Sequence, residues 1–188
     1  VLITGLTVFS QGIEFQKGRY AEVLEMAKKQ NKLVFIDIYT SWCGPCKHMA
    51  DKVFPQAKVG EYYNAHFLNL KLDAEKSEDG KMVAKTFGVS AYPTFLFVNG
   101  DVELVYRFLG GKTVDMFVKE GEKAVVAFAA QPELKKYTKK YEEGNRDKEF
   151  LNQYFILKDR SGLDCSDVLL DYFALVDDSQ LLDSINVP

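Results

Sequence analysis

Apolar residues in the first part of the chain alternate between a helical and an extended pattern. The three- and four-residue spacing of a helical face comes first, in Tyr20, Val23, Leu24 and Ala27. Asn31 follows it, and Asn is a residue type at which helices end. The next segment, 33–39, is β-branched, aromatic and almost continuously apolar. Strands covered on both faces have this composition, so a helix followed by a buried strand is predicted.

Two further strands are predicted downstream. One covers 67–72, and the segment before it has room for a crossover helix that begins near Cys43, as parallel strands require. The pattern therefore predicts a βαβ unit. A helix over 81–87 should end at Gly88, which suits a left-handed cap, before a third strand at 94–98.

The Asn-Gly pair at 99–100 separates two apolar runs. Such a pair favours a tight two-residue turn, so 102–108 should return antiparallel beside the preceding strand. The sheet is therefore expected to be mixed. The Gly-Gly pair at 110–111 ends that strand, and a last amphipathic helix begins at Val114 and runs into 124–130.

After Pro132 the pattern changes to paired helices, with breaks at 144–145 and 161–162. These pieces resemble one or two units of an α-helical repeat, although no clean internal period is present, and a helical cap on the main domain is the alternative. The predicted organisation is an α/β domain over 13–130 and an α-helical extension over 131–188.

Residues 1–12 are apolar and uncharged. They resemble the remnant of a secretory signal peptide that lacks its basic part, and a first strand or a disordered tail is the alternative. On the first interpretation the protein is periplasmic or otherwise secreted; on the second, a cytoplasmic location remains open. No apolar run approaches the roughly 20 residues that cross a bilayer, so no membrane span is predicted.

Composition narrows the class further. The 188 residues are 47% hydrophobic and 27% charged, as in ordinary globular proteins. A formal net charge of −3 gives no basic footprint for nucleic acid. Three cysteines are too few for a disulfide scaffold, but two of them, Cys43 and Cys46, are one helical turn apart. That spacing indicates redox or metal chemistry.

The Cys43–Cys46 pair meets the geometric needs of thiol–disulfide exchange. A thiolate must attack a disulfide, and a second thiol must be close enough to resolve the mixed disulfide. At a helix start, Cys43 would face free backbone N–H groups, which stabilise a thiolate. Pro45 suits a first helical turn, and Gly44 puts no side chain between the sulfurs and a substrate.

Two alternatives to redox exchange for this pair are a structural zinc site and a structural disulfide. A structural zinc site needs four ligands in paired spacing, and the remaining candidates, His48, His66 and Cys165, are unpaired. We therefore expect no metal. A purely structural disulfide would close a very short loop and stabilise the fold only weakly.

The sequence Trp42-Cys43-Gly44-Pro45-Cys46-Lys47 is identical to the active-site motif of the thioredoxin family. Asp37 stands where that family has a buried carboxylate, and 88–100 resembles its cis-proline loop, strand and Asn-Gly turn. The resemblance covers about 13–130. It implies a thioredoxin-like mixed β-sheet flanked by helices, with the helical extension outside it.

The resemblance also implies roles. Cys43 and Cys46 would be catalytic, and Asp37 would assist proton transfer at the second cysteine. The surface that contacts the substrate would comprise Trp42, Gly44, Pro45, Tyr92 and Pro93. The implied reaction is dithiol–disulfide exchange with protein thiols and disulfides, in the reducing direction, with an unidentified redox donor protein and no cofactor.

One departure from the family concerns the Lys near its buried Asp. An alignment through Asp73 places Asn69 at that position, so the resemblance does not imply which residue sets the pKa of Asp37. The segment 47–54, together with 61–64, looks more like periplasmic thioredoxin-fold proteins than like small cytosolic carriers. Cys165, among apolar neighbours in the extension, is expected to be redox-inert.

The rival hypothesis is a binding module or chaperone-like adaptor. In that case the groove at Pro93 and the helical tail would hold a partner without redox turnover.

Overall fold

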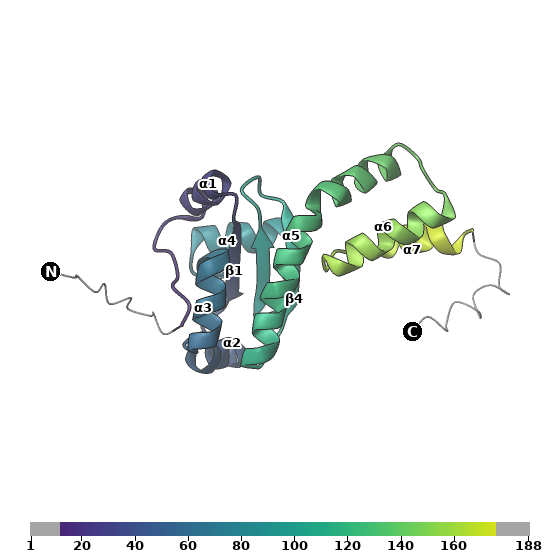
Figure 1. The fold of residues 1–188 in the computed structure, drawn as a ribbon. Coiled ribbons are helices and arrows are strands. Elements are labelled where there is room, and N and C mark those ends of the chain that lie inside the picture. Colours follow the sequence, from purple (N-terminus) through teal and green to yellow (C-terminus); the bar gives the residue numbers. More distant parts are fainter. Residues whose placement is uncertain (1–11, 176–188) are drawn as a thin grey trace. The chain divides into compact units, whose positions relative to one another are not determined.

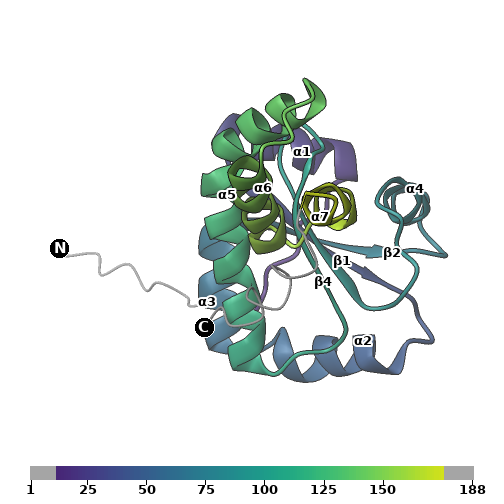
Figure 2. The same cartoon turned by 90° about the vertical axis from the view of Figure 1, so that its right-hand side faces the viewer.

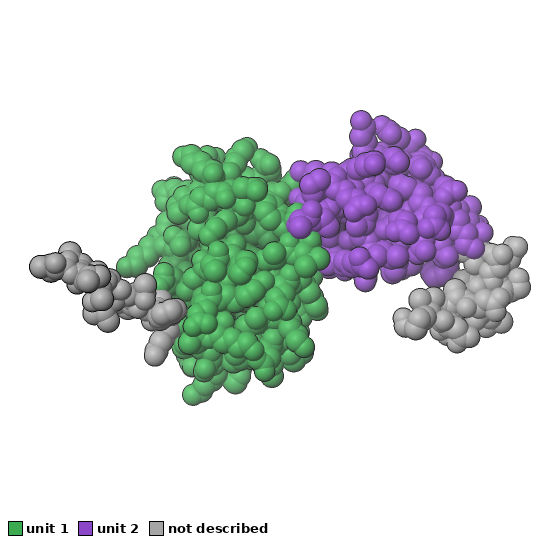
Figure 3. Space-filling view, in the orientation of Figure 1, with its two compact units in different colours: residues 1–128 green, residues 129–188 purple. Residues whose placement is uncertain are grey.

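The computed structural model describes residues 12–175. The chain divides into two compact units, residues 1–128 and 129–188 (Figure 3). Of the proposed signal-peptide remnant at 1–12, all but Gly12 lies outside the described residues. Among the described residues, no helix combines the length and the apolar character needed to cross a bilayer.

A mixed four-stranded sheet forms the centre of the first unit, as the sequence predicts. Its strands are β1 (Leu33–Tyr39), β2 (Phe67–Asp73), β3 (Thr94–Val98) and β4 (Leu104–Leu109). The order across the sheet is β2-β1-β3-β4. β1 is parallel to β2 and antiparallel to β3, and β4 is antiparallel to β3. The predicted βαβ unit and the antiparallel return strand are both confirmed.

Helices cover both faces of this sheet (Figures 1 and 2). They are α1 (Tyr20–Gln30), α2 (Gly44–His48), the π-helical turn η1 (Met49–Val53), α3 (Ala57–His66), α4 (Glu78–Thr86) and α5 (Val114–Glu142). Side chains of β1 alternate between two cores. Val34, Ile36 and Ile38 join the core under α1 and α4, whereas Leu33 and Phe35 join the core with α3 and α5. This explains the continuous apolar run.

The predicted two-residue hairpin turn is wrong. The loop spans 99–103, and β4 begins at Leu104 rather than at residue 102. The Asn99 side-chain oxygen accepts hydrogen bonds from the backbone N–H groups of Asp101 and Glu103, each at 3.0 Å. These bonds close a longer loop, and the positive φ falls on Val102, at 65°.

The helix predicted to run into 124–130 continues through Pro132 to Glu142. A proline removes one helical hydrogen bond. Beyond it, Leu134 is buried and Tyr137 packs against the same apolar cluster, so tertiary packing stabilises the continued helix. The boundary between the two compact units falls within α5, between Phe128 and Ala129.

The second unit continues with α6 (Lys148–Arg160) and α7 (Ser166–Phe173). The predicted breaks are confirmed, and the glycines there, Gly144 and Gly162, have φ of 92° and 62°. Its buried core consists of Leu134, Phe150, Leu151, Tyr154 and Val168.

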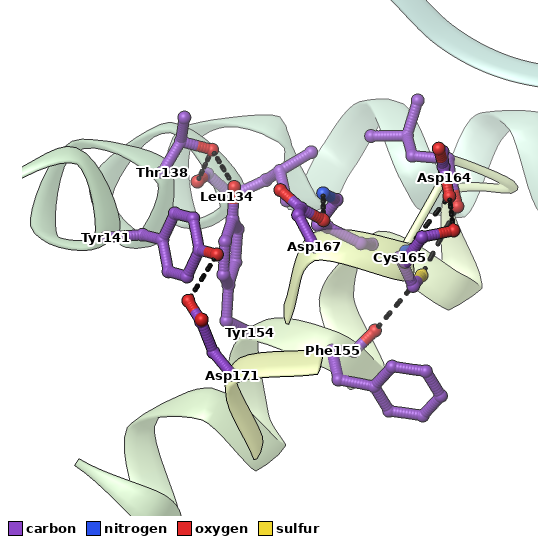
Figure 4. Close-up of polar contacts among 12 residues, drawn as sticks. Leu134, Thr138, Tyr141, Tyr154, Phe155, Asp164, Cys165, Asp167 and Asp171 are labelled. Carbon is purple, nitrogen blue, oxygen red and sulfur yellow. Dashed lines mark hydrogen bonds and ion pairs between the residues drawn. The ribbon is translucent and has the colours of Figure 1, made fainter. Parts of the chain in front are cut away.

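Polar contacts join the helices of the second unit (Figure 4). The Tyr141 hydroxyl donates to Asp171 at 2.6 Å, and the Tyr154 hydroxyl donates to Thr138 at 3.0 Å. Cys165 is half-buried there, and its thiol donates to the Leu163 carbonyl at 3.3 Å. Burial raises the pKa of this thiol, which disfavours the reactive thiolate.

Gly100 has a packing role that can be tested. A Cβ at this position would lie 2.5 Å from the Lys28 Cα of α1. We therefore expect Gly100→Ala to lower the free energy of unfolding by about 1–3 kcal/mol in chemical denaturation. The matched control is Gly111→Ala, where the nearest atom to a new Cβ is the Met49 sulfur at 3.8 Å. Equal stability of the two variants would contradict the packing role.

Candidate active site

The redox pair lies where β1 leads into α2. Cys43 is the N-cap residue of α2, and Cys46 follows one turn later. Their sulfurs form a disulfide with an S–S distance of 2.02 Å. The Cys46 N–H donates to the Cys43 sulfur at 3.1 Å, so a free backbone donor at the helix start is aimed at this atom. The same contact would stabilise a Cys43 thiolate.

Two small residues separate the cysteines along the chain. Both cysteines are buried, whereas Gly44 and Pro45 between them are exposed. Pro45 occupies the first turn of α2, where a missing N–H costs no helical hydrogen bond. Apart from its chain neighbours and the backbone of α2, no atom of the described residues lies within 4 Å of a Cβ built on Gly44. A substrate can therefore approach the pair across this turn.

The loop before β3 lies beside the active-site turn. The Tyr92–Pro93 peptide bond is cis, and the Pro93 carbonyl accepts a hydrogen bond from the Gly110 N–H at 2.9 Å. The ring of Tyr92 contacts the ring of Trp42 edge to face, with 6.0 Å between centroids. Residues far apart in sequence thus meet next to the cysteines.

Trp42 lies on the surface rather than packed over the sulfurs, since 64% of it is exposed. Its indole N–H donates to both carboxylate oxygens of Glu75, at 3.1 and 3.0 Å. Glu75 follows the end of β2, and sequence reasoning did not identify it. The sequence signal that could have identified Glu75 is its place directly after a strand parallel to β1, because two parallel strands have their carboxyl ends at the same end of the sheet.

Asp37 is buried in the centre of β1, with 1% of its surface exposed. Neither carboxylate oxygen has a hydrogen-bond partner within residues 12–175. The Lys71 ammonium is 3.6 Å from one of them, at ion-pair distance. Burial raises the pKa of the Asp37 carboxyl to about 7, and the nearby Lys71 charge opposes this rise.

A lysine lies near Asp37 although Asn69 stands at the family's lysine position. Asp37 is in register with Lys71 on the neighbouring parallel strand, so a lysine is present after all. Asn69 instead holds the N-terminal segment, because its side-chain N–H donates to the Glu14 carbonyl at 3.3 Å and to Asn64 at 2.9 Å. A strand register is a tertiary property, which the sequence alignment did not contain.

A surface groove borders the redox pair. The sequence analysis did not predict it. It is lined by Pro45, His48, Gly111, Lys112 and Thr113. The Lys112 N–H donates to the Met49 sulfur at 3.3 Å, which joins this loop to the turn after α2. Among the described residues, no cluster of His, Cys, Asp and Glu could hold a metal ion.

Comparison with known proteins gives the class. The model of the thioredoxin-like domain matches residues 20–125. The chain therefore belongs to the thioredoxin-like family. The matched region contains β1 to β4 and the Cys43–Cys46 pair.

Individual relatives agree with this assignment. Thioredoxin H4 of Arabidopsis thaliana is 36% identical over 96 residues, which are 51% of this chain and 75% of that protein. A disulphide-isomerase-like protein of Bacteroides thetaiotaomicron is 42% identical, with a TM-score of 0.55 over 62% of this chain and 95% of its own. A thioredoxin structure from Thermus thermophilus shares the fold, at 24% identity and a TM-score of 0.57, over 64% of this chain and 93% of its own. The chain is a thioredoxin-like thiol–disulfide oxidoreductase.

The raised pKa of Asp37 predicts a pH-dependent stability. Because the pKa of about 7 in the folded protein exceeds the ordinary pKa of 3.8, the folded protein binds more protons than the unfolded chain between these pH values. Stability is therefore lost as the pH rises through this window. Asp37→Asn removes this titration. In the oxidised protein, the free energy of unfolding of the variant minus that of wild type should therefore rise from pH 4 to pH 8, by at most about 4 kcal/mol.

Denaturant unfolding at several pH values measures this difference. The exposed Asp51→Asn variant is the matched control, because a solvated carboxylate carries no burial cost. A constant difference between Asp37→Asn and wild type over the whole pH range would contradict the raised pKa.

Proposed function

We propose that this protein reduces disulfides in protein substrates. The observation that carries the proposal is the position of Cys43 at the start of α2, with its sulfur accepting the Cys46 N–H. The Gly44-Pro45 spacer, which resembles that of the reducing members of the family, supports this direction.

Exchange proceeds in two steps in this proposal. The Cys43 thiolate attacks one sulfur of the substrate disulfide, which forms a mixed disulfide and releases the other substrate sulfur as a thiolate. Cys46, as a thiolate, then attacks the Cys43 sulfur and releases the second substrate thiolate. The substrate gains two electrons and takes up protons to form thiols, and the protein is left with the Cys43–Cys46 disulfide. A redox donor protein would reduce this disulfide again.

Asp37 is proposed to accept the proton of Cys46 during the second step. A carboxyl with a pKa of about 7 can exchange protons near neutral pH, which is what a general acid or base requires. Among the described residues, Lys71 is the one stabilising partner of the buried Asp37 carboxylate, and this favours a functional reason for the charge.

The substrate is proposed to lie across Gly44 and Pro45, between Trp42 and the Tyr92–Pro93 loop. Gly44 and Pro45 are exposed, and the contact between Tyr92 and Trp42 brings the two borders together. An extended substrate segment could pair with the backbone beside Pro93. We also propose a location outside the cytoplasm, supported by the apolar residues 1–12 and the resemblance of 47–54 to periplasmic proteins.

The equilibrium reduction potential of the Cys43–Cys46 pair tests the direction. Titration against glutathione or dithiothreitol can be followed through Trp42, the single tryptophan. We expect a value of about −270 mV, as for a reductase. A value of about −120 mV would indicate an oxidant of folding proteins, and a pair that never titrates would contradict exchange altogether.

Cysteine variants test the order of the steps. Cys43→Ser should abolish disulfide reduction, because no nucleophile remains. Cys46→Ser should accumulate a mixed disulfide with the substrate, detectable by mass spectrometry, because the resolving thiol is missing. Cys165→Ser is the control and should react like wild type. Full biological activity of Cys43→Ser would instead favour the binding module.

A further inference from the structure

Charges of opposite sign flank the redox pair. β2 and β4 are the two edges of the sheet, and both run in the direction of β1. The segments that follow them therefore emerge at the same end of the sheet as Cys43. Glu75 follows β2, whereas Lys112 follows β4. The active-site turn thus has the Glu75 carboxylate, with Lys76 next to it in the chain, on one side and the Lys112 ammonium on the other.

The acidic side is fixed by Trp42. The indole N–H holds the Glu75 carboxylate through two hydrogen bonds, so this negative charge stays beside the exposed ring. An anionic group of a substrate would be repelled here, because the carboxylate has no cation among these contacts.

The basic side is the groove lined by Pro45, His48, Gly111, Lys112 and Thr113. None of these five residues is acidic. The Lys112 ammonium donates to the Leu109 carbonyl at 3.2 Å and lies 5.8 Å from the Phe108 ring, so its charge is held at the groove. Asp115 is an acidic residue three positions after Lys112, and its carboxylate forms an ion pair with Lys58 at 2.5 Å.

The groove also has space for a side chain. Gly111 contributes none, and the closest atom to a Cβ built there is the Met49 sulfur, 3.8 Å away. The Gly110 N–H bond to Pro93 and the Lys112 N–H bond to Met49 hold this loop beside the substrate surface. Pro45 belongs to both the groove and the active-site turn.

We propose that the groove binds an acidic side chain of the substrate protein, adjacent to its reactive cysteine. The Lys112 ammonium attracts the carboxylate of that side chain. The Glu75 carboxylate repels an acidic side chain on the opposite side of the substrate's reactive cysteine. The proposal rests on the proposed function, since it assumes that protein disulfides react at Cys43. It assigns a substrate preference that the redox motif alone does not give.

Single-turnover kinetics can test the preference. Reduced protein is mixed with synthetic peptides that contain one intramolecular disulfide and carry Glu, Gln or Lys directly before or directly after the attacked cysteine. Trp42 fluorescence reports the second-order rate constant of oxidation. We expect Glu to react about three- to tenfold faster than Lys in one of the two positions, as for a partly exposed charge pair, and the ratio to fall in 0.5 M salt.

Charge variants locate the effect. Lys112→Glu should invert the ratio between the Glu and Lys peptides, and Lys112→Gln should bring it near one. Because each variant is judged by this ratio, a changed reactivity of Cys43 itself cancels. Lys85→Glu, an exposed residue of α4, makes the same change in net charge and should keep the wild-type ratio.

The outcomes separate the two proposals. Equal rate constants for all peptides, or a ratio that Lys112→Glu leaves unchanged, would overturn the acidic preference while disulfide exchange stands. If no peptide oxidises the Cys43–Cys46 pair, the proposed function fails and the preference fails with it.

Discussion

The burial of β1 is the constraint on which the active site depends. This strand has a hydrogen-bonded neighbour on each edge and a hydrophobic core on each face. Its carboxyl end is therefore fixed, and the turn that follows can place Cys43 at the first position of a helix. A helix start has backbone N–H groups without helical partners, and here one of them is aimed at the sulfur. A rigid strand thus gives a reactive atom a defined electrostatic environment.

The same burial creates the second feature of the site. A carboxylate within β1 loses hydration, and in return the part of the chain that the structure describes supplies the Lys71 ammonium at 3.6 Å and no hydrogen bond. The Lys71 ammonium also lies 4.6 Å from the Tyr39 ring centroid and 5.5 Å from that of Phe54, so it is held against aromatic faces as well as beside Asp37. The balance leaves a carboxyl that titrates near neutrality at the cost of stability. The proposed proton transfer and the stability of the fold are therefore opposed at this residue.

Sequence reasoning located the elements whose signals are local. The apolar run of β1, the helix cap at Gly88 and the breaks at Gly144 and Gly162 each depend on a few neighbouring residues, and all are present in the structure. The Asn-Gly turn failed because the Asn99 side chain closes a longer loop, and Gly100 is required by its closeness to α1. Pro132 failed as a helix end because packing outweighs the loss of one hydrogen bond.

The candidate site divides along the same line. Cys43, Cys46 and Pro93 were found because motif and spacing mark them, whereas the positions of Lys71, Glu75 and Lys112 near the site are defined only by the sheet. Lys71 requires the register of β1 with β2, and the other two require the knowledge that β2 and β4 are the edges. The common motif supplies the exchange chemistry, so differences between such proteins must come from the residues around it. In this fold, the segments after the two edge strands are where a change of charge alters the substrate surface without disturbing the buried strand that positions the cysteines.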